Sequence, residues 1–116
     1  MDFTASKGVA CMMCLMMVSC FSNRENQDTI PRTHLVEING FEFNPAYVQA
    51  IVGDTIRWVN KDIVPHTATE VSERWHSSEL KLEGEWWQVI KQSADYYCEY
   101  HPSMKGRIEI ADTSHE

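Results

Sequence analysis

The sequence has few basic residues, few cysteines and no long apolar run, and each shortage excludes a class of protein. Ten Lys and Arg stand against 17 Asp and Glu, which gives a formal net charge of -7 at pH 7. Such a charge makes nucleic acid an unsuitable partner. The apolar stretch 8–18 is shorter than the roughly 20 residues that a membrane-spanning helix needs. No internal repeat is visible either.

The apolar stretch at residues 8–18 has the length of the hydrophobic region of a secretory signal peptide. We therefore expect residues 1–19 to be a cleaved leader and the protein to be exported to the bacterial periplasm. Met17-Val18-Ser19-Cys20 is similar to a bacterial lipobox, in which the cysteine is lipidated and becomes the new N-terminus. Lipid on Cys20 would attach the protein to the membrane. Ordinary signal cleavage nearby is the alternative.

The cysteines follow the same division. Of the four, Cys11 and Cys14 lie in the leader and Cys20 follows it, so Cys98 is the single thiol of the expected mature domain. No disulfide is then available to that domain. An unpaired thiol in an oxidising compartment is a liability unless something occupies it, and a metal ion does so.

The rest of the chain divides into an anchor and linker (20–33), one domain (34–111) and a short tail (112–116). Within the domain, short segments with a period of two are rich in β-branched and aromatic residues. They are 35–38, 47–52, 55–59, 86–90, 95–98 and 107–110. Turn signals such as Asn39-Gly40 separate them. This pattern predicts an all-β, antiparallel sandwich. Residues 72–83 fit both a strand and an irregular excursion.

Three metal-binding side chains lie close together near the end of the domain. Cys98, His101 and Met104 supply a thiolate, an imidazole and a thioether three residues apart. A soft thiolate, imidazoles and a weak thioether form the donor set that suits copper. His66, which follows Pro65 at the end of a strand-like stretch, is the best candidate for the missing imidazole. The other histidines are expected to be ordinary surface residues: His34, His76 and His115.

Four segments carry a resemblance to a known family: 41–45, 52–60, 65–67 and 98–106. Together they resemble the cupredoxins, the small blue copper proteins, and within them the plastocyanin and amicyanin type. The resemblance covers residues 34–111 and implies a Greek-key β-sandwich with one type 1 copper ion. The copper ligands that it implies are His66, Cys98, His101 and Met104.

The resemblance also implies roles for the residues around the ligands. The edge of His101 is expected to be exposed within an apolar patch and to act as the electron port, and Tyr97, next to Cys98, offers a second exit. Pro102 restricts the backbone of the ligand loop. Thr67 stands where the family often has an asparagine that ties the two ligand loops together, and its hydroxyl could make a similar bond with less reach.

These features favour a one-electron carrier, not an enzyme. A nucleophile and base pair of Cys98 and His101 lacks an oxyanion hole and a third orienting group, so no catalytic residue is expected. An envelope protein for copper binding or trafficking is the alternative, although it would favour an open site rich in methionine or histidine. A structural zinc ion would gain little from a thioether. The acidic charge favours a redox partner with a basic docking surface. We expect a monomer.

Overall fold

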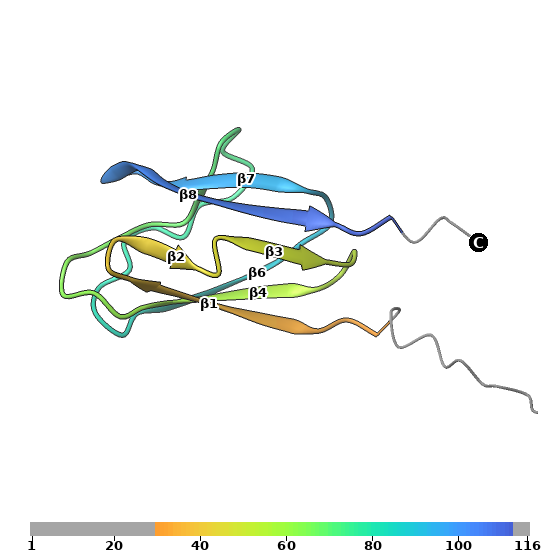
Figure 1. Cartoon of the computed structure of the whole chain (residues 1–116), viewed down its shortest axis with the longest axis horizontal. Coiled ribbons are helices and arrows are strands. Elements are labelled where there is room, and N and C mark those ends of the chain that lie inside the picture. Colours follow the sequence, from red (N-terminus) through yellow and green to blue (C-terminus); the bar gives the residue numbers. More distant parts are fainter. Residues whose placement is uncertain (1–29, 113–116) are drawn as a thin grey trace, which may run out of the picture.

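The computed structural model describes residues 30–112. Over this range the chain forms two four-stranded β-sheets, and its regular elements are all strands (Figure 1). No helix in the described range is long and apolar enough to cross a membrane. The predicted leader, the lipidation site at Cys20, most of the linker and most of the tail lie outside this range and stay predictions.

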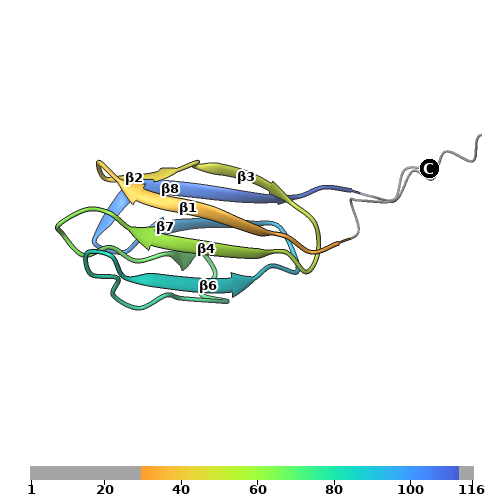
Figure 2. The same ribbon diagram turned by 90° about the horizontal axis from the view of Figure 1, so that it is seen from below.

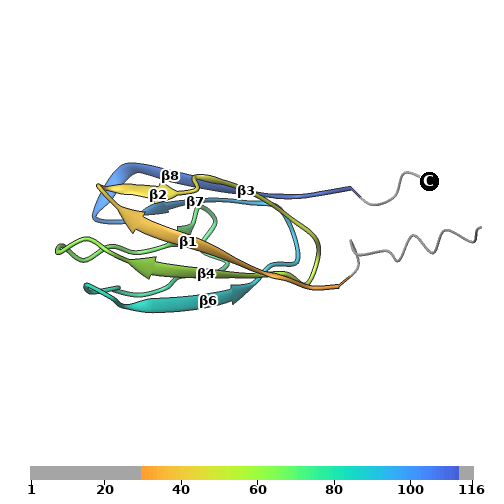
Figure 3. The ribbon, with the colours of Figure 1, turned by 60° about the horizontal axis from the view of Figure 1, so that its bottom comes forward.

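Each sheet combines strands from distant parts of the sequence, and Figures 2 and 3 show the two layers from other sides. The first sheet has the order β2-β1-β4-β6. Its strands are β1 (Thr33–Asn39), β2 (Glu42–Asn44), β4 (Thr55–Asn60) and β6 (Glu85–Val89). The second has the order β3-β8-β7-β5. Its strands are β3 (Tyr47–Ala50), β5 (Thr69–Glu70), β7 (Ala94–Cys98) and β8 (His101–Ile110).

The all-β prediction is confirmed, but the expectation of purely antiparallel pairing is wrong. Strands β1 and β4 pair in parallel, as do β3 and β8. The reason lies at residues 45–46, where the chain passes from one sheet to the other between β2 and β3 without reversing direction (Figure 1). One reversal is therefore missing, and β4 returns in the direction of β1.

The core lies between the sheets and contains several large aromatic side chains. Tyr96 is buried on β7, and its ring packs against Phe43 and Trp58 with ring centroids 4.7 Å and 5.4 Å apart. On the neighbouring strand, a Cβ atom added at Gly106 would lie 2.1 Å from Cζ of Tyr96. Glycine at this position therefore allows the tyrosine ring to lie across β8 and fill the core.

Residues 71–84 form the irregular excursion that was one of the two expectations for 72–83. Two isolated bridges hold it to the preceding segment, His66 with Leu80 and Thr69 with His76. In the first bridge the backbone N–H and carbonyl groups of His66 and Leu80 bond to each other at 3.1 and 2.8 Å. The excursion therefore holds the backbone of His66, one of the predicted metal ligands, in place.

The two ends of the sandwich differ in what they carry. The described chain begins and finishes at one end, at the right of Figure 1, where β3 also turns into β4. The connections that follow β1, β4 and β7 lie at the other end. The predicted metal ligands lie at this second end: His66 follows β4, Cys98 ends β7, and His101 and Met104 lie in the first part of β8.

Candidate metal centre

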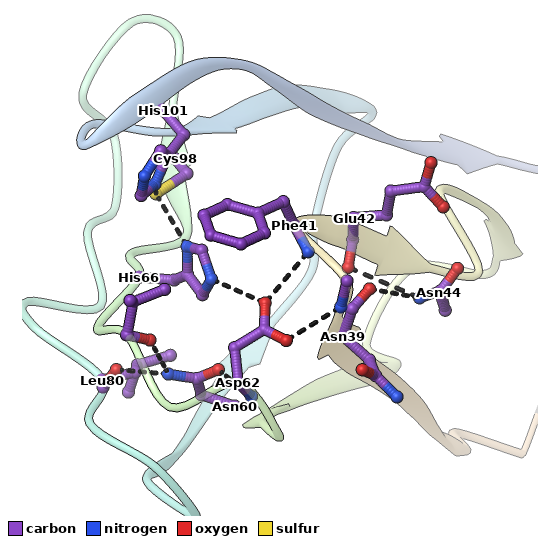
Figure 4. Close-up of polar contacts among 12 residues, drawn as sticks. Asn39, Phe41, Glu42, Asn44, Asn60, Asp62, His66, Leu80, Cys98 and His101 are labelled. Carbon is purple, nitrogen blue, oxygen red and sulfur yellow. Dashed lines mark hydrogen bonds and ion pairs between the residues drawn. The ribbon is translucent and has the colours of Figure 1, made fainter.

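Two histidines and the cysteine meet at the end of the sandwich that carries the connections after β1, β4 and β7 (Figure 4). The Nδ1 atoms of His66 and His101 lie 3.6 Å and 3.9 Å from the Sγ atom of Cys98. The three donor atoms all lie within 4.8 Å of one another, so the group could hold one metal ion. His66 and Cys98 are fully buried, whereas His101 is only half-buried. A thiolate and two imidazoles fit copper.

The ligand loop is shaped by an irregularity in the pairing of β7 with β8. Cys98 pairs with His101, whereas the preceding Tyr97 pairs with Lys105, which leaves residues 102–104 outside the ladder. In a regular strand, residues three apart point to opposite faces. The irregularity interrupts that alternation at residues 102 and 103, which are both exposed, and the alternation resumes at Met104, which is buried and belongs to the same apolar cluster as Cys98.

Thr67 connects the two ligand loops. Its backbone N–H donates a hydrogen bond to Sγ of Cys98 at 3.4 Å. Its hydroxyl oxygen accepts a hydrogen bond from the backbone N–H of Glu99 at 2.9 Å. The hydroxyl also lies 3.0 Å from that of Thr69. The threonine therefore makes an inter-loop bond in spite of its short reach.

Asp62 lies below His66 and bonds to three N–H groups (Figure 4). Its Oδ2 atom lies 2.8 Å from Nε2 of His66 and accepts the backbone N–H of Phe41 at 3.0 Å. Its Oδ1 atom accepts the backbone N–H of Gly40 at 2.8 Å. Burial alone would raise the pKa of the Asp62 carboxyl, but the bonds from Phe41, Gly40 and His66 outweigh it and lower the pKa below its ordinary value.

The ring of Phe41 covers the two imidazoles. It lies edge-on to His66 and to His101, with ring centroids 5.3 Å and 4.9 Å apart. The φ angles of Gly40 and Phe41 are 63° and 61°, a region that residues with a side chain rarely adopt. Phe41 is 48% exposed, so its ring separates the imidazoles from solvent on this side.

Asn60 shapes the loop that carries Asp62 and His66. It is fully buried, and its side-chain amide donates to the carbonyl oxygens of Val64 and Leu80 at 2.9 and 2.8 Å. Its Oδ1 atom accepts the backbone N–H of Asp62 at 2.8 Å. An asparagine that bonds to the backbone two residues later is a recognisable turn signal at the end of a strand.

No sequence motif indicated Asn60, Asp62 or Phe41 as residues of the site. Asp62 lies four residues before His66, and this spacing was a usable signal for a carboxylate near the imidazole. The contacts of Phe41 had no such signal, because the ring reaches imidazoles that are 25 and 60 residues further along the chain.

The surface around the cluster is largely apolar. Phe41, Ile63, Val64 and Tyr100 are exposed on the loops that carry or cover the ligands. Pro102 is exposed as well, next to the half-buried His101. Tyr97 is half-buried on β7.

Among the described residues, His34 and His76 do not belong to the metal-binding group. His76 is exposed, as expected, and its Nε2 atom lies 2.9 Å from a carboxylate oxygen of Glu99. His34 is half-buried instead of freely exposed, and its Nε2 atom lies 2.7 Å from Oδ2 of Asp54. The sequence pattern gave no sign of that partner, which is 20 residues away. His115 lies outside the described residues.

Comparison with known proteins is informative at the level of structure. No protein-family model and no curated protein matches the chain. Two solved amicyanin variants, both Cu(I) forms, superpose with TM-scores of 0.63 and 0.64 at 23% and 24% identity. Each match covers 68% of this chain and 82% of the amicyanin chain. A copper-containing nitrite reductase from Thermus scotoductus SA-01 matches with a TM-score of 0.61 at 23% identity, over 72% of this chain and 23% of the enzyme.

Proposed function

We propose that this chain, whose fold is that of the cupredoxins, is a small type 1 copper protein that carries single electrons between redox proteins of the bacterial periplasm. His66, Cys98 and His101 would hold the ion, and the thioether of Met104 would be a weak fourth donor. Bound copper supplies a centre that accepts and releases one electron. The observation that carries the proposal is the grouping of a thiol and two imidazoles at one end of a rigid sandwich, with only one imidazole near the surface.

The surroundings of the ligands support electron transfer because they oppose rearrangement. A metal site transfers electrons slowly when its ligands must rearrange each time the metal changes oxidation state. Here the backbone of His66 is bonded to Leu80, and the loop of Cys98 is bonded to Thr67. Two of the three grouped ligands are also completely buried, which favours a permanently held ion over the exchangeable one of a trafficking protein.

His101 is the proposed electron port. It is half-buried, the ring of Phe41 packs against it, and its neighbours Tyr100 and Pro102 are exposed, so a partner could approach closely over this part of the surface. Tyr97, beside Cys98, is the proposed second exit. Desolvation and the nearby carboxylates of Glu79 and Glu99 raise the pKa of the Tyr100 hydroxyl. These carboxylates support a docking partner with a basic surface, because opposite fields accelerate short encounters.

The proposed location depends on the leader. An apolar leader followed by Cys20 supports export and attachment to the membrane through lipid. Replacement of Cys20 by serine is expected to release the mature protein from the detergent phase of a bacterial envelope preparation. A native protein found wholly in the soluble periplasmic fraction would contradict the anchor, and it would leave the copper site untouched.

The function can be tested by metal titration of the protein from Ser22 onward, which includes every strand of both sheets. We expect an intense blue colour that saturates at one equivalent of copper(II) and persists when zinc is added in equal amount. A colourless product, or loss of the colour to equimolar zinc, would contradict the proposal.

A further inference from the structure

We infer that Asp62 is a positioning residue that holds the ring of His66 and the cover formed by Phe41 in one arrangement, and that its negative charge strengthens His66 as a metal donor. The first half concerns the protein without metal. The second half rests on the proposed copper function. Neither follows from the ligand pattern, which does not include Asp62.

The geometry requires a carboxylate at this position. Three N–H groups, from Gly40, Phe41 and His66, point at the two oxygens of Asp62 at 2.8 to 3.0 Å. An ionised carboxylate carries only acceptors and satisfies all three groups. An amide would present its own N–H₂ group to at least one of these donors.

The bond to Asp62 determines which nitrogen of His66 is free. Because the carboxylate is only an acceptor, a neutral imidazole at this position carries its single proton on Nε2, and Nδ1 is then left with its lone pair. That nitrogen lies 3.6 Å from Sγ of Cys98. The pair therefore aims the donor atom of His66 at the thiol before any metal arrives.

The same carboxylate holds the cover over the site. Its bonds to the backbone of Gly40 and Phe41 support a turn in which both residues have positive φ angles. The ring of Phe41 then contacts both His66 and His101. Loss of the carboxylate should release the turn and the histidine together.

Asp62 is itself firmly placed. Its backbone N–H is bonded to Oδ1 of the buried Asn60, whose amide is bonded to the carbonyl oxygens of Val64 and Leu80. Leu80 is also paired with the backbone of His66. These contacts form a closed set, so the distance between the carboxylate and the imidazole does not depend on a freely rotating loop.

The electronic effect follows from the charge. A carboxylate that accepts a hydrogen bond from a metal-bound imidazole makes the ring a stronger electron donor to the metal. Loss of such a partner typically weakens metal affinity 10- to 100-fold. A stronger donor favours copper(II) over copper(I). Asp62 should therefore lower the reduction potential.

The opposite end of the sandwich provides a matched control residue. Asp54 accepts the backbone N–H groups of Arg32 and Ile51 at 2.8 and 3.0 Å, and it lies 2.7 Å from Nε2 of His34. Asp54→Asn therefore removes the same kind of carboxylate from two backbone donors and one imidazole. It leaves the metal cluster untouched.

The metal-free test compares Asp62→Asn with Asp54→Asn by long-range ¹H–¹⁵N spectra of the imidazoles, in the protein from Ser22 onward. We expect His66 to be the Nε2-protonated tautomer in the parent and in Asp54→Asn, and a mixture of tautomers in Asp62→Asn. Asp62→Ala, which leaves no side-chain acceptor for Nε2 and introduces no competing donor, carries the same expectation. An unchanged His66 tautomer in folded Asp62→Ala would overturn the positioning role.

The second test measures the copper potential of the same proteins by redox titration. Asp62→Asn should lower the preference for copper(II) over copper(I) about tenfold, which raises the potential by about 59 mV for a one-electron couple. Asp54→Asn should leave the potential unchanged. A parent protein that binds no copper would contradict the proposed function but not the positioning role. A copper-loaded Asp62→Asn with the parent potential would overturn the electronic role.

Discussion

Each end of the sandwich contains a carboxylate that faces an imidazole, but only one of these pairs is part of the metal site. At one end, Asp54 accepts two backbone N–H groups and faces the imidazole of His34. At the other, Asp62 accepts two backbone N–H groups and faces the imidazole of His66. In both cases the carboxylate closes a turn and links it to a distant strand or loop.

The two ends differ because only one of them receives a further chain segment with metal-binding side chains. The turn between β7 and β8 brings Cys98 and His101 to the end that contains Asp62 and His66. Within the described residues, the other end has no comparable group of metal-binding side chains. A carboxylate and imidazole pair is therefore a structural device, and it becomes part of a metal site only where another loop adds a thiol and a second imidazole.

The largest effect on this contrast should come from Cys98→Ser. A hydroxyl cannot supply the soft, strongly donating bond of a thiolate, so the blue colour should be lost entirely while the sandwich remains folded. Visible absorption with added copper(II) and far-ultraviolet circular dichroism check the two expectations. A blue Cys98→Ser protein would mean that the copper lies elsewhere.

The two imidazoles of the site should respond differently to deletion. His66→Gly and His101→Gly should both weaken copper binding, but added imidazole should restore colour readily only in His101→Gly, because His66 is fully buried and His101 is half-exposed. Absorption titrations with imidazole measure the restoration. Equal recovery in both variants, or none in His101→Gly, would show that the port is misplaced.

Asp54→Asn should affect stability and not copper. We expect a loss of about 1–3 kcal/mol in the free energy of unfolding at neutral pH, because partly buried N–H groups lose hydrogen bonds to a charged acceptor. Urea denaturation measures this loss, and the copper spectrum of the folded variant serves as the control. A changed spectrum with unchanged stability would contradict the separation of the two ends.

The pH dependence of that loss has a defined sign. Burial favours a higher pKa for Asp54, but the bonds from His34, Ile51 and Arg32 outweigh it and lower the pKa below its ordinary value. Its contribution is therefore complete above the unfolded-state pKa of about 3.9 and is lost as the pH falls through the lower folded-state pKa. The stability difference between the parent and Asp54→Asn should shrink as the pH falls below about 4. A difference that grows in acid would contradict this account.

The sequence predicted the part of the site that lies within a short segment. Cys98, His101 and Met104 lie within seven residues, and their side-chain chemistry indicated a metal without any knowledge of the fold. His66 was identified because it follows Pro65 and the polar turn that comes after a strand-like stretch. The donor atoms of three of these four residues lie within 4.8 Å of one another in the structure, and Met104 lies in the adjoining apolar cluster.

The missed features depend on contacts between distant segments. Strands β2 and β5 are three and two residues long, too short to show a period of two. The parallel strand pairs arise because the chain passes from one sheet to the other between β2 and β3. No local sequence pattern predicts this passage. The bonds of Asp62 reach Gly40 and Phe41 across more than 20 residues, so their convergence appears only in the folded chain.

A smaller effect is expected from Met104→Leu, which removes a weak donor and keeps a side chain of similar volume. The blue colour should persist and the reduction potential should rise, because the thioether favours copper(II). Redox titration of the loaded variant measures the change. Loss of colour would show that Met104 is more than a weak axial donor.

The most direct test of the central claim is spectroelectrochemistry of the copper-loaded protein through repeated cycles. A one-electron carrier predicts that the blue colour bleaches and returns as a single one-electron couple, with all of the copper retained by the protein after each cycle. Release of copper on reduction would contradict the electron-carrier account and would favour the trafficking alternative.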